Sequence, residues 1–214
     1  KESPKHYHQE KKLSIQQLKS ALLNRNIIAL LVTQLFLAYA FVCMESMYPL
    51  YVNKRYGIGS NWVGYVLTLY GICTAVTQGL AIGFLRKFTT DQVLAIVGIA
   101  SFGISLIGNT LVPSFSWAVV LAVWNSVSDG LFTPTLSGLT SISAPANMQG
   151  LVLGVTESVA SLGRILSPFT SGLLFDVDVN YPFYIAGAFA LVSAASAAFV
   201  RVSTKEPFEG VEYT

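Results

Sequence analysis

Six long apolar segments run through the middle of the chain, separated by short polar breaks. They cover residues 26–52, 61–85, 92–112, 116–142, 148–175 and 181–200. A helix needs about 20 mostly apolar residues to cross the hydrocarbon core of a bilayer, whereas a barrel strand needs only about 10. Each break carries glycine, proline or charged residues typical of a turn. Because open backbone in lipid would leave amide groups unpaired, the pattern predicts six membrane-spanning helices.

The sequence therefore predicts an all-α, polytopic membrane protein with three parts. Residues 26–201 form a six-helix transmembrane bundle, residues 1–25 a polar and basic linker, and residues 202–214 a tail. Apolar residues recur at helical spacing near the end of the linker, which predicts a short interfacial helix there. Because the chain opens with Lys1 rather than Met, we expect it to be an internal piece of a longer polypeptide.

Composition agrees with the membrane class, since 53% of the residues are hydrophobic and only 11% are charged. The mean hydropathy is +0.58. A net charge of +2 gives no indication of nucleic-acid binding. The only histidines, His6 and His8, lie in the polar linker, where such pairs are usually solvated. We therefore expect no metal, no cofactor and no enzymatic activity.

Lysine and arginine in the short flanking segments predict the orientation, because cytoplasmic loops carry an excess of them. On the side of the chain ends the basic residues are Lys1, Lys5, Lys11, Lys12, Lys19, Arg25, Arg86, Lys87, Arg201 and Lys205. The opposite side carries only Lys54 and Arg55, and its last loop holds Asp176 and Asp178. We expect both termini in the cytoplasm, and the plasma membrane rather than an organelle.

Four ionisable side chains lie within the predicted spans, where a charge is tolerated if it faces a bundle interior or a watery cavity. They are Glu45 in the first span, Asp129 in the fourth, and Glu157 and Arg164 in the fifth. The third and sixth spans carry none away from their ends. We therefore expect the third and sixth helices to face lipid and the others to line a wet interior.

Asp129 and Glu157 are the strongest candidates for proton coupling. Both lie roughly 10–15 Å from the cytoplasmic ends of their helices, at a rise of about 1.5 Å per residue. Two carboxylates that lie close together can share a proton near neutral pH. A structural role, in a buried hydrogen-bond network or beside Arg164, is equally open for each. Glu45 lies near the outer end of its span, where a wetted helix exit would explain it.

Arg164 is a further proton-coupling candidate and lies about 10 Å along the helix axis from Glu157. At that separation a direct pair would need both side chains to stretch. We therefore expect Glu157 and Arg164 each to meet a partner on another helix or in a missing half of the protein.

Gln34, Gln78, Trp124 and Asn125 are weaker candidates for lining a substrate cavity. Trp124 and Asn125 precede Asp129 by about one helical turn, so at least one of them shares its face. Interhelical hydrogen bonding would explain the same residues without a substrate.

Glycines and prolines indicate close helix contacts and bends. Pro134 and Pro168 interrupt the fourth and fifth spans and are expected to bend them. Bent helices suit alternating access, and packing alone would account for them as well. Two glycine pairs have the spacing with which small residues let helices approach: Gly79 with Gly83, and Gly150 with Gly154.

The most specific motif is Met-Gln-Gly-Leu-Val-Leu-Gly at residues 148–154, followed by Ser158, Ser-Leu-Gly-Arg at 161–164, Ser-Pro at 167–168 and Gly-Leu-Leu-Phe-Asp at 172–176. This order resembles the eleventh helix of the major facilitator superfamily, in its proton-coupled drug-efflux branch, which includes the tetracycline exporters. Residues 45–57 resemble the seventh helix and its outer loop. Residues 79–87 resemble the second copy of the family's cytoplasmic loop motif, although no Asp follows Leu85.

The resemblance implies that the chain is the C-terminal six-helix half of a transporter, built from two inverted three-helix repeats. Such transporters have two halves around a midplane cavity and rock between inward and outward states. The third and sixth helices of each half are peripheral. The implied partners are protons, a small organic substrate, membrane lipid, and the N-terminal half or a second copy of this chain. The resemblance also suggests that Glu45 and Arg164 occupy positions that are often polar in this branch.

Two other functions stay open on the sequence alone. The same fold could take up a sugar or an organic anion, and a six-helix protein could act as a scaffold, channel or receptor. A channel would repeat its pore-lining groups symmetrically, and none repeats in this sequence. An intramembrane enzyme has no Ser-His or metal-ligand arrangement to support it.

Overall fold

The computed structural model describes residues 23–145 and 147–200. Within that part the chain is helical and has no strand, which confirms the all-α prediction. The interfacial helix predicted for the linker, His6, His8 and the tail after residue 201 lie outside the described residues. The elements are α2 (Arg25–Tyr56), α3 (Ser60–Val76), η1 (Thr77–Ala81), α4 (Ile82–Leu85), α5 (Asp91–Asn109), α6 (Phe115–Ser143), α7 (Gln149–Val177) and α8 (Tyr181–Ala198).

Six helical rods in the described residues are long and apolar enough to cross a membrane. α3, η1 and α4 follow one another without a break and form one rod, Ser60–Leu85. The six predicted spans are thus confirmed. The largest difference is at the end of α2, which continues past Val52 to Tyr56. Gly57 ends it with a φ of 67°, a left-handed conformation that glycine adopts without steric cost.

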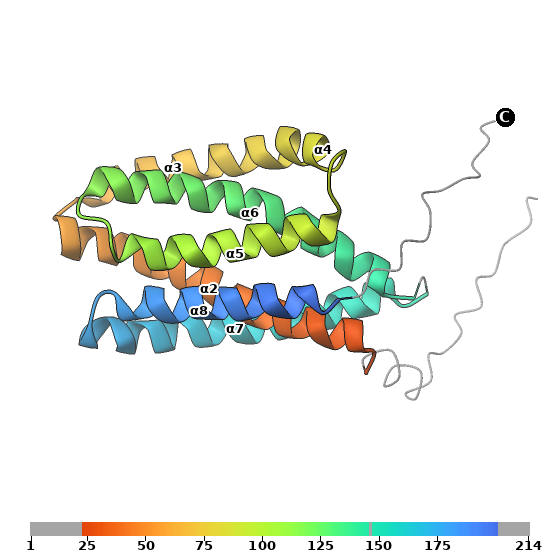
Figure 1. Ribbon diagram of the computed structural model, residues 1–214. Helices are drawn as coiled ribbons and strands as arrows, with labels where there is room; N and C mark the ends of the chain where they lie inside the picture. Colours follow the sequence, from red (N-terminus) through yellow and green to blue (C-terminus); the bar gives the residue numbers. More distant parts are fainter. Residues whose placement is uncertain (1–22, 146, 201–214) are drawn as a thin grey trace, which may run out of the picture.

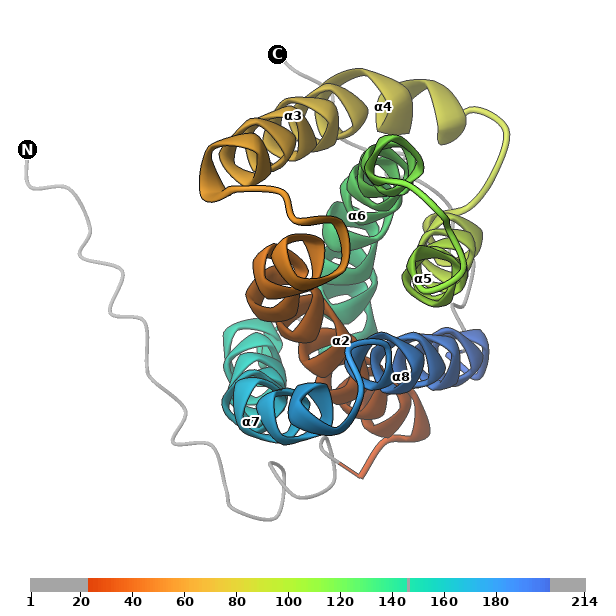
Figure 2. The ribbon, with the colours of Figure 1, turned by 90° about the vertical axis from the view of Figure 1, so that its left-hand side faces the viewer.

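The rods lie side by side, with the ends at Arg25 and Ala198 on one side of the bundle (Figure 1). We call this side the termini end and the other, at Gly57, the loop end. α2 contacts α7 and α8, while α6 contacts α3 and α5. α5 and α8 contact each other and lie on the right in Figure 2, whereas α3 lies at the upper left and α7 at the lower left; α8 also contacts α7.

These contacts have an internal symmetry. In chain order, α2 corresponds to α6, the rod that begins with α3 corresponds to α7, and α5 corresponds to α8. Under this correspondence the contact of α2 with α7 is equivalent to that of α6 with α3. Likewise, the contact of α2 with α8 is equivalent to that of α6 with α5. Because successive rods alternate in direction, corresponding rods of the two sets run in opposite directions. The fold therefore consists of two inverted three-helix repeats, as predicted.

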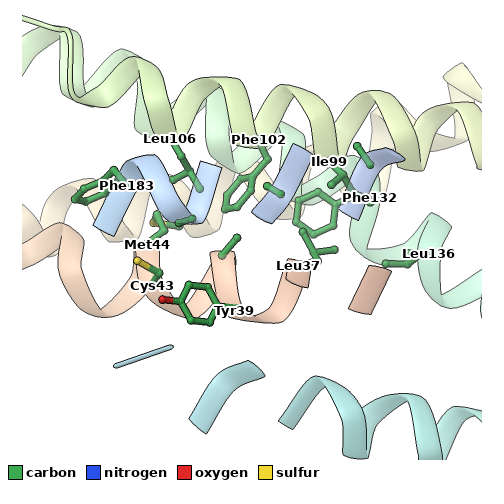
Figure 3. Close-up of a cluster of buried hydrophobic side chains, with 14 of the residues drawn as sticks. Leu37, Tyr39, Cys43, Met44, Ile99, Phe102, Leu106, Phe132, Leu136 and Phe183 are labelled. Atoms are coloured by element: carbon green, nitrogen blue, oxygen red, sulfur yellow. The ribbon is translucent and has the colours of Figure 1, made fainter. Parts of the chain in front are cut away.

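The apolar core lies where α2, α5, α6 and α8 meet (Figure 3). Phe102 and Phe183 are fully buried there, together with Tyr48 and Tyr51. The buried phenols are satisfied, since Tyr51 Oη donates to the carbonyl of Asn109 at 2.7 Å and Tyr48 Oη to that of Ala118 at 3.4 Å. In a medium without water such partners are needed, because an unpaired polar group is costly.

The closest helix contacts do not fall at the glycine pairs singled out from the sequence. A Cβ at any of those four glycines would meet nothing within 4 Å in this chain. Tight contacts occur instead where a Cβ on Gly103 would lie 2.9 Å from the carbonyl oxygen of Gly187, and where one on Gly163 would collide with the backbone of Leu35. The spacing of small residues indicates a face, but it does not say whether another helix of the same chain covers that face.

The loop end is closed by a cluster around Arg55. Its guanidinium donates to Asn180 Oδ1 at 2.7 Å and to the carbonyl of Val112 at 3.2 Å. Tyr56 Oη donates to the same carbonyl at 3.1 Å. The end of α2 is thereby tied to the α5–α6 and α7–α8 loops.

Candidate functional site

A cavity of about 220 Å³ opens between α2, α6 and α7, nearer the termini end of the bundle. It combines ionisable and polar groups with a few apolar ones. Its lining residues are Gln34, Leu37, Ala38, Phe41, Asp129, Phe132, Thr133, Leu136, Ser137, Glu157 and Arg164. We call it the main cavity.

Asp129 is the buried acid of the main cavity, with 8% of its surface exposed. Its Oδ1 accepts a hydrogen bond from Thr133 Oγ1 at 2.7 Å, one helical turn further along α6. The hydroxyls of Tyr70 and Thr74 on α3 lie near the carboxyl group, and that of Thr74 donates to the carbonyl of Ser126 at 3.2 Å. Among the residues that the structure describes, no cation forms an ion pair with Asp129. The hydrogen bond from Thr133 is therefore the only one that holds this carboxyl group within the described part of the chain.

Glu157 and Arg164 form an ion pair along α7, with 3.0 Å between Glu157 Oε2 and Arg164 Nη1. The two residues thus pair directly with each other and not with another helix of the described residues, contrary to that part of the expectation. Because Glu157 and Arg164 are seven positions apart, their side chains lie on the same helix face. Both side chains are long, so together they span the separation along the helix axis. Their side chains are 61% and 48% exposed, respectively. The pair forms the α7 wall of the main cavity.

The remaining candidates are divided between the main cavity and other places. Gln34 lines the main cavity with Asp129, Glu157 and Arg164. Glu45 and Gln78 are exposed on α2 and η1, outside the main cavity.

Trp124 and Asn125 point away from the main cavity and from each other. The indole of Trp124 is largely exposed and donates to Ser101 Oγ on α5 at 2.7 Å. Asn125 is 1% exposed and lines a separate, small cavity between α2, α3 and α6.

Sequence reasoning missed three hydroxyl residues of this region. Thr133 and Ser137 follow Asp129 at helical spacing on the same face, so the spacing rule could have found them. Tyr70 could not have been found in this way, because a tyrosine within an apolar span is indistinguishable from a core aromatic. Its position beside Asp129 depends on the packing of α3 against α6.

The arrangement is suited to moving a proton and receiving a polar or charged solute. A buried carboxyl group that contacts only hydroxyls can gain or lose a proton without breaking an ion pair. The described residues contain no cluster of three or more histidine, cysteine, aspartate or glutamate side chains that could hold a metal ion.

Comparisons with known proteins agree with this architecture. Multidrug resistance protein 1 of Bacillus subtilis is 29% identical over 171 residues, which cover 79% of this chain and 42% of the relative. The class E tetracycline resistance protein of Escherichia coli is 27% identical over 130 residues, covering 61% of this chain and 32% of the relative. A quinolone resistance protein of Staphylococcus aureus is 22% identical over 145 residues, covering 68% and 37%.

The chain spans less than half of the length of each of these relatives. The model of the Major Facilitator Superfamily matches residues 30–212, which is most of the chain. With its six apolar rods in two inverted repeats, this multi-pass membrane protein belongs to the major facilitator superfamily.

Proposed function

We propose that this chain supplies one six-helix half of a secondary transporter that exports small organic compounds in exchange for protons. The observation that carries the proposal is Asp129, a buried carboxyl group without an ion-pair partner among the described residues, on the wall of a cavity between three spans. A charge in such a place is costly, so the presence of an ionisable residue there supports a role in transport. Asp129 binds a proton in one state of the cycle and releases it in the other.

The names of the relatives support the substrate class. They are described as multidrug, tetracycline and quinolone resistance proteins. The main cavity has a mixed lining, with the apolar Phe41 and Phe132 beside the Glu157–Arg164 pair. A surface of this kind binds organic molecules that have both an apolar body and a polar group.

The exposed helices support a partner for this half. α3 and α7 are the least buried of the six rods and carry large exposed apolar side chains, among them Trp62, Tyr65, Ile165 and Phe169. α5 and α8, on the other side of the bundle, are the lipid-facing pair. The face between α3 and α7 contacts the other six-helix half, whether that is an N-terminal half or a second copy.

The charge distribution supports an orientation with the termini end in the cytoplasm. Arg25, Arg86 and Lys87 lie at this end, whereas Lys54 and Arg55 lie at the loop end. In this orientation residues 1–25 and 202–214 are cytoplasmic, and the plasma membrane is the natural location for an exporter.

A transport assay tests the proposal. The complete transporter in proteoliposomes with an acidic lumen is expected to accumulate a fluorescent cationic dye, because outward proton flow drives inward dye movement. A proton-exchanging ionophore and protein-free liposomes serve as controls. Dye movement that does not depend on the pH gradient would exclude proton exchange. Uptake of a sugar or an organic anion, without dye transport, would exclude drug export.

The ion pair on α7 gives a second prediction. Glu157→Gln leaves Arg164 as an unpaired cation on the cavity wall, which repels a cationic dye. We expect the KM for that dye to rise about fivefold, the equivalent of about 1 kcal/mol for an exposed pair. The double variant Glu157→Gln with Arg164→Gln should restore the KM, and the KM for an uncharged dye should stay constant throughout. Equal changes for both dyes would contradict the electrostatic explanation.

A further inference from the structure

Three buried side-chain atoms among the described residues have no hydrogen-bond partner. They are Tyr70 Oη, Asn109 Oδ1 and Asn125 Oδ1. At membrane depth an unpaired polar atom is expensive, so each requires an explanation. Two of the three, on Tyr70 and Asn125, belong to residues that line the same small cavity.

This small cavity lies between α2, α3 and α6 and has a volume of about 10 Å³. That is close to the space that one water molecule needs, about 10–15 Å³ on the same measure. The other lining residues are Met44, Tyr48, Val66, Leu67 and Ala122. The hydroxyl of Tyr48 is already used, since it donates to the carbonyl of Ala118. The polar partners available to a water molecule are therefore the Tyr70 hydroxyl and the side-chain oxygen Oδ1 of Asn125.

The small cavity adjoins Asp129 on the side facing the loop end. Asn125 precedes Asp129 by one turn of α6, in the direction of the loop end. The Tyr70 hydroxyl approaches the Asp129 carboxyl group without completing a hydrogen bond to it. Tyr70 is thus in contact with the small cavity and beside the acid of the main cavity.

A third cavity continues the series toward the loop end. It has a volume of about 390 Å³, lies between α2 and α3, and includes Pro49, Asn53 and Ser60 in its lining. Leu67 lines both this outer cavity and the small one. Along α2 the cavities follow one another: Gln34 to Phe41 line the main cavity, Met44 and Tyr48 the small one, and Pro49 to Asn53 the outer one.

We propose that Tyr70 and Asn125 bind a water molecule that passes protons between the outer cavity and Asp129. The inference rests on the proposed function, because it supplies the route by which Asp129 is loaded. The Tyr70 hydroxyl donates its proton to the carboxylate and takes another from the bound water. The water in turn regains a proton from the outer cavity. One proton moves, and only Asp129 ends in a changed state.

Leu67 lies between the two cavities on this route, because it lines both the outer and the small one. Tyr70 and Asn125 are positioning residues, since they hold the water rather than contact the transported compound.

The test compares Tyr70→Phe and Asn125→Leu with wild-type transporter in proteoliposomes. Each variant removes one polar partner of the water while keeping the side chain's size. We expect dye transport driven by a pH gradient to slow roughly tenfold, at the lower end of what a proton-transfer group contributes. Dye-for-dye exchange at equal pH should keep its wild-type rate. Tyr184→Phe, on α8 and remote from the site, is the matched control and should behave as wild type.

Infrared difference spectroscopy supplies a readout that a structural role would not change. When Asp129 is titrated, wild type and Tyr184→Phe should show an O–H stretching band that shifts in water enriched in oxygen-18, whereas Tyr70→Phe and Asn125→Leu should lack it. If one of the two variants does not fold, the infrared band of the wild type and the behaviour of the other variant still test the inference. Absence of the band in wild type, or normal gradient-driven transport in both variants, overturns the inference. If gradient-driven transport also survives Asp129→Asn, the part of the proposed function that makes Asp129 the proton carrier fails with it.

Discussion

Replacing Asp129 with asparagine is expected to reduce proton-driven transport by roughly a hundredfold or more, the range associated with losing a proton-transfer group. Asparagine has the same shape, so the hydrogen bond from Thr133 Oγ1 and the main cavity are retained. It cannot bind and release a proton, however, so the pH gradient no longer drives the cycle. Dye-for-dye exchange at equal pH should continue, because it requires no net proton movement.

The measurement is the initial rate of dye accumulation in proteoliposomes, with and without an imposed gradient. Asp176→Asn is the matched control, since Asp176 is exposed near the loop end of α7 and lines none of the three cavities. It should transport as wild type does. Gradient-driven transport that persists when Asp129→Asn is combined with Glu157→Gln would show that neither carboxyl group carries the proton.

Replacing Gly163 with alanine is expected to destabilise the protein by about 1–3 kcal/mol, the usual cost of forcing extra volume into a packed contact. The added Cβ would collide with the carbonyl oxygen of Leu35, a backbone atom that cannot rotate away. α2 and α7 would have to separate, and Ser167 Oγ would then lose its 2.8 Å hydrogen bond to the carbonyl of Tyr39.

Thermal unfolding of the detergent-solubilised transporter measures this effect. Gly108→Ala is the matched control, because it makes the same change in α5, away from the face between α3 and α7, where the new Cβ would lie 3.6 Å from Leu121 Cδ1, an ordinary van der Waals distance. Alanine is also the better helix former, so this control should be as stable as wild type or slightly more so. Equal melting temperatures for the two variants would mean that the α2–α7 crossing is looser than the structure indicates.

The spans and their order could be predicted from sequence because the bilayer imposes a length and an apolar composition on each helix. Turn chemistry predicted breaks near Gly57 and Pro113, but not the exact helix ends. α2 continues past Val52 to Tyr56, and α5 ends at Asn109, before Pro113. The ionisable residues lie in the first, fourth and fifth spans, and the main cavity lies between the corresponding helices α2, α6 and α7. The second span was also expected to line the interior, but it contributes no residue to this cavity.

What sequence could not supply was the rotation of each helix about its own axis. Trp124 and Asn125 are adjacent in the chain, yet one contacts Ser101 on α5 and the other faces α2 and α3. The π-helical turn η1 has the same consequence for the second span, because its extra residue per turn shifts every later side chain around the axis. Gln78 lies in this turn and is exposed. Periodicity counted along the sequence assumes a uniform helix and cannot detect such a shift.

The Glu157–Arg164 pair shows a second limit. Separation along the axis was estimated between backbones, whereas the contact is made by the ends of two long side chains. The small-residue motifs show a third, since Gly103 and Gly187 meet although neither belongs to a recognised pair.

The contact between Gly103 and Gly187 has a consequence for how this half moves. Because the backbones of α5 and α8 touch there, sliding one repeat past the other would drive main-chain atoms into each other. The contact between α5 and α8 therefore joins the two repeats, and the hydrogen bonds of Arg55 join them again at the loop end. α3 and α7 are the least buried of the six rods and take no part in this contact. We therefore expect deformation of this half to concentrate in these two helices, while α5 and α8 keep their relative position.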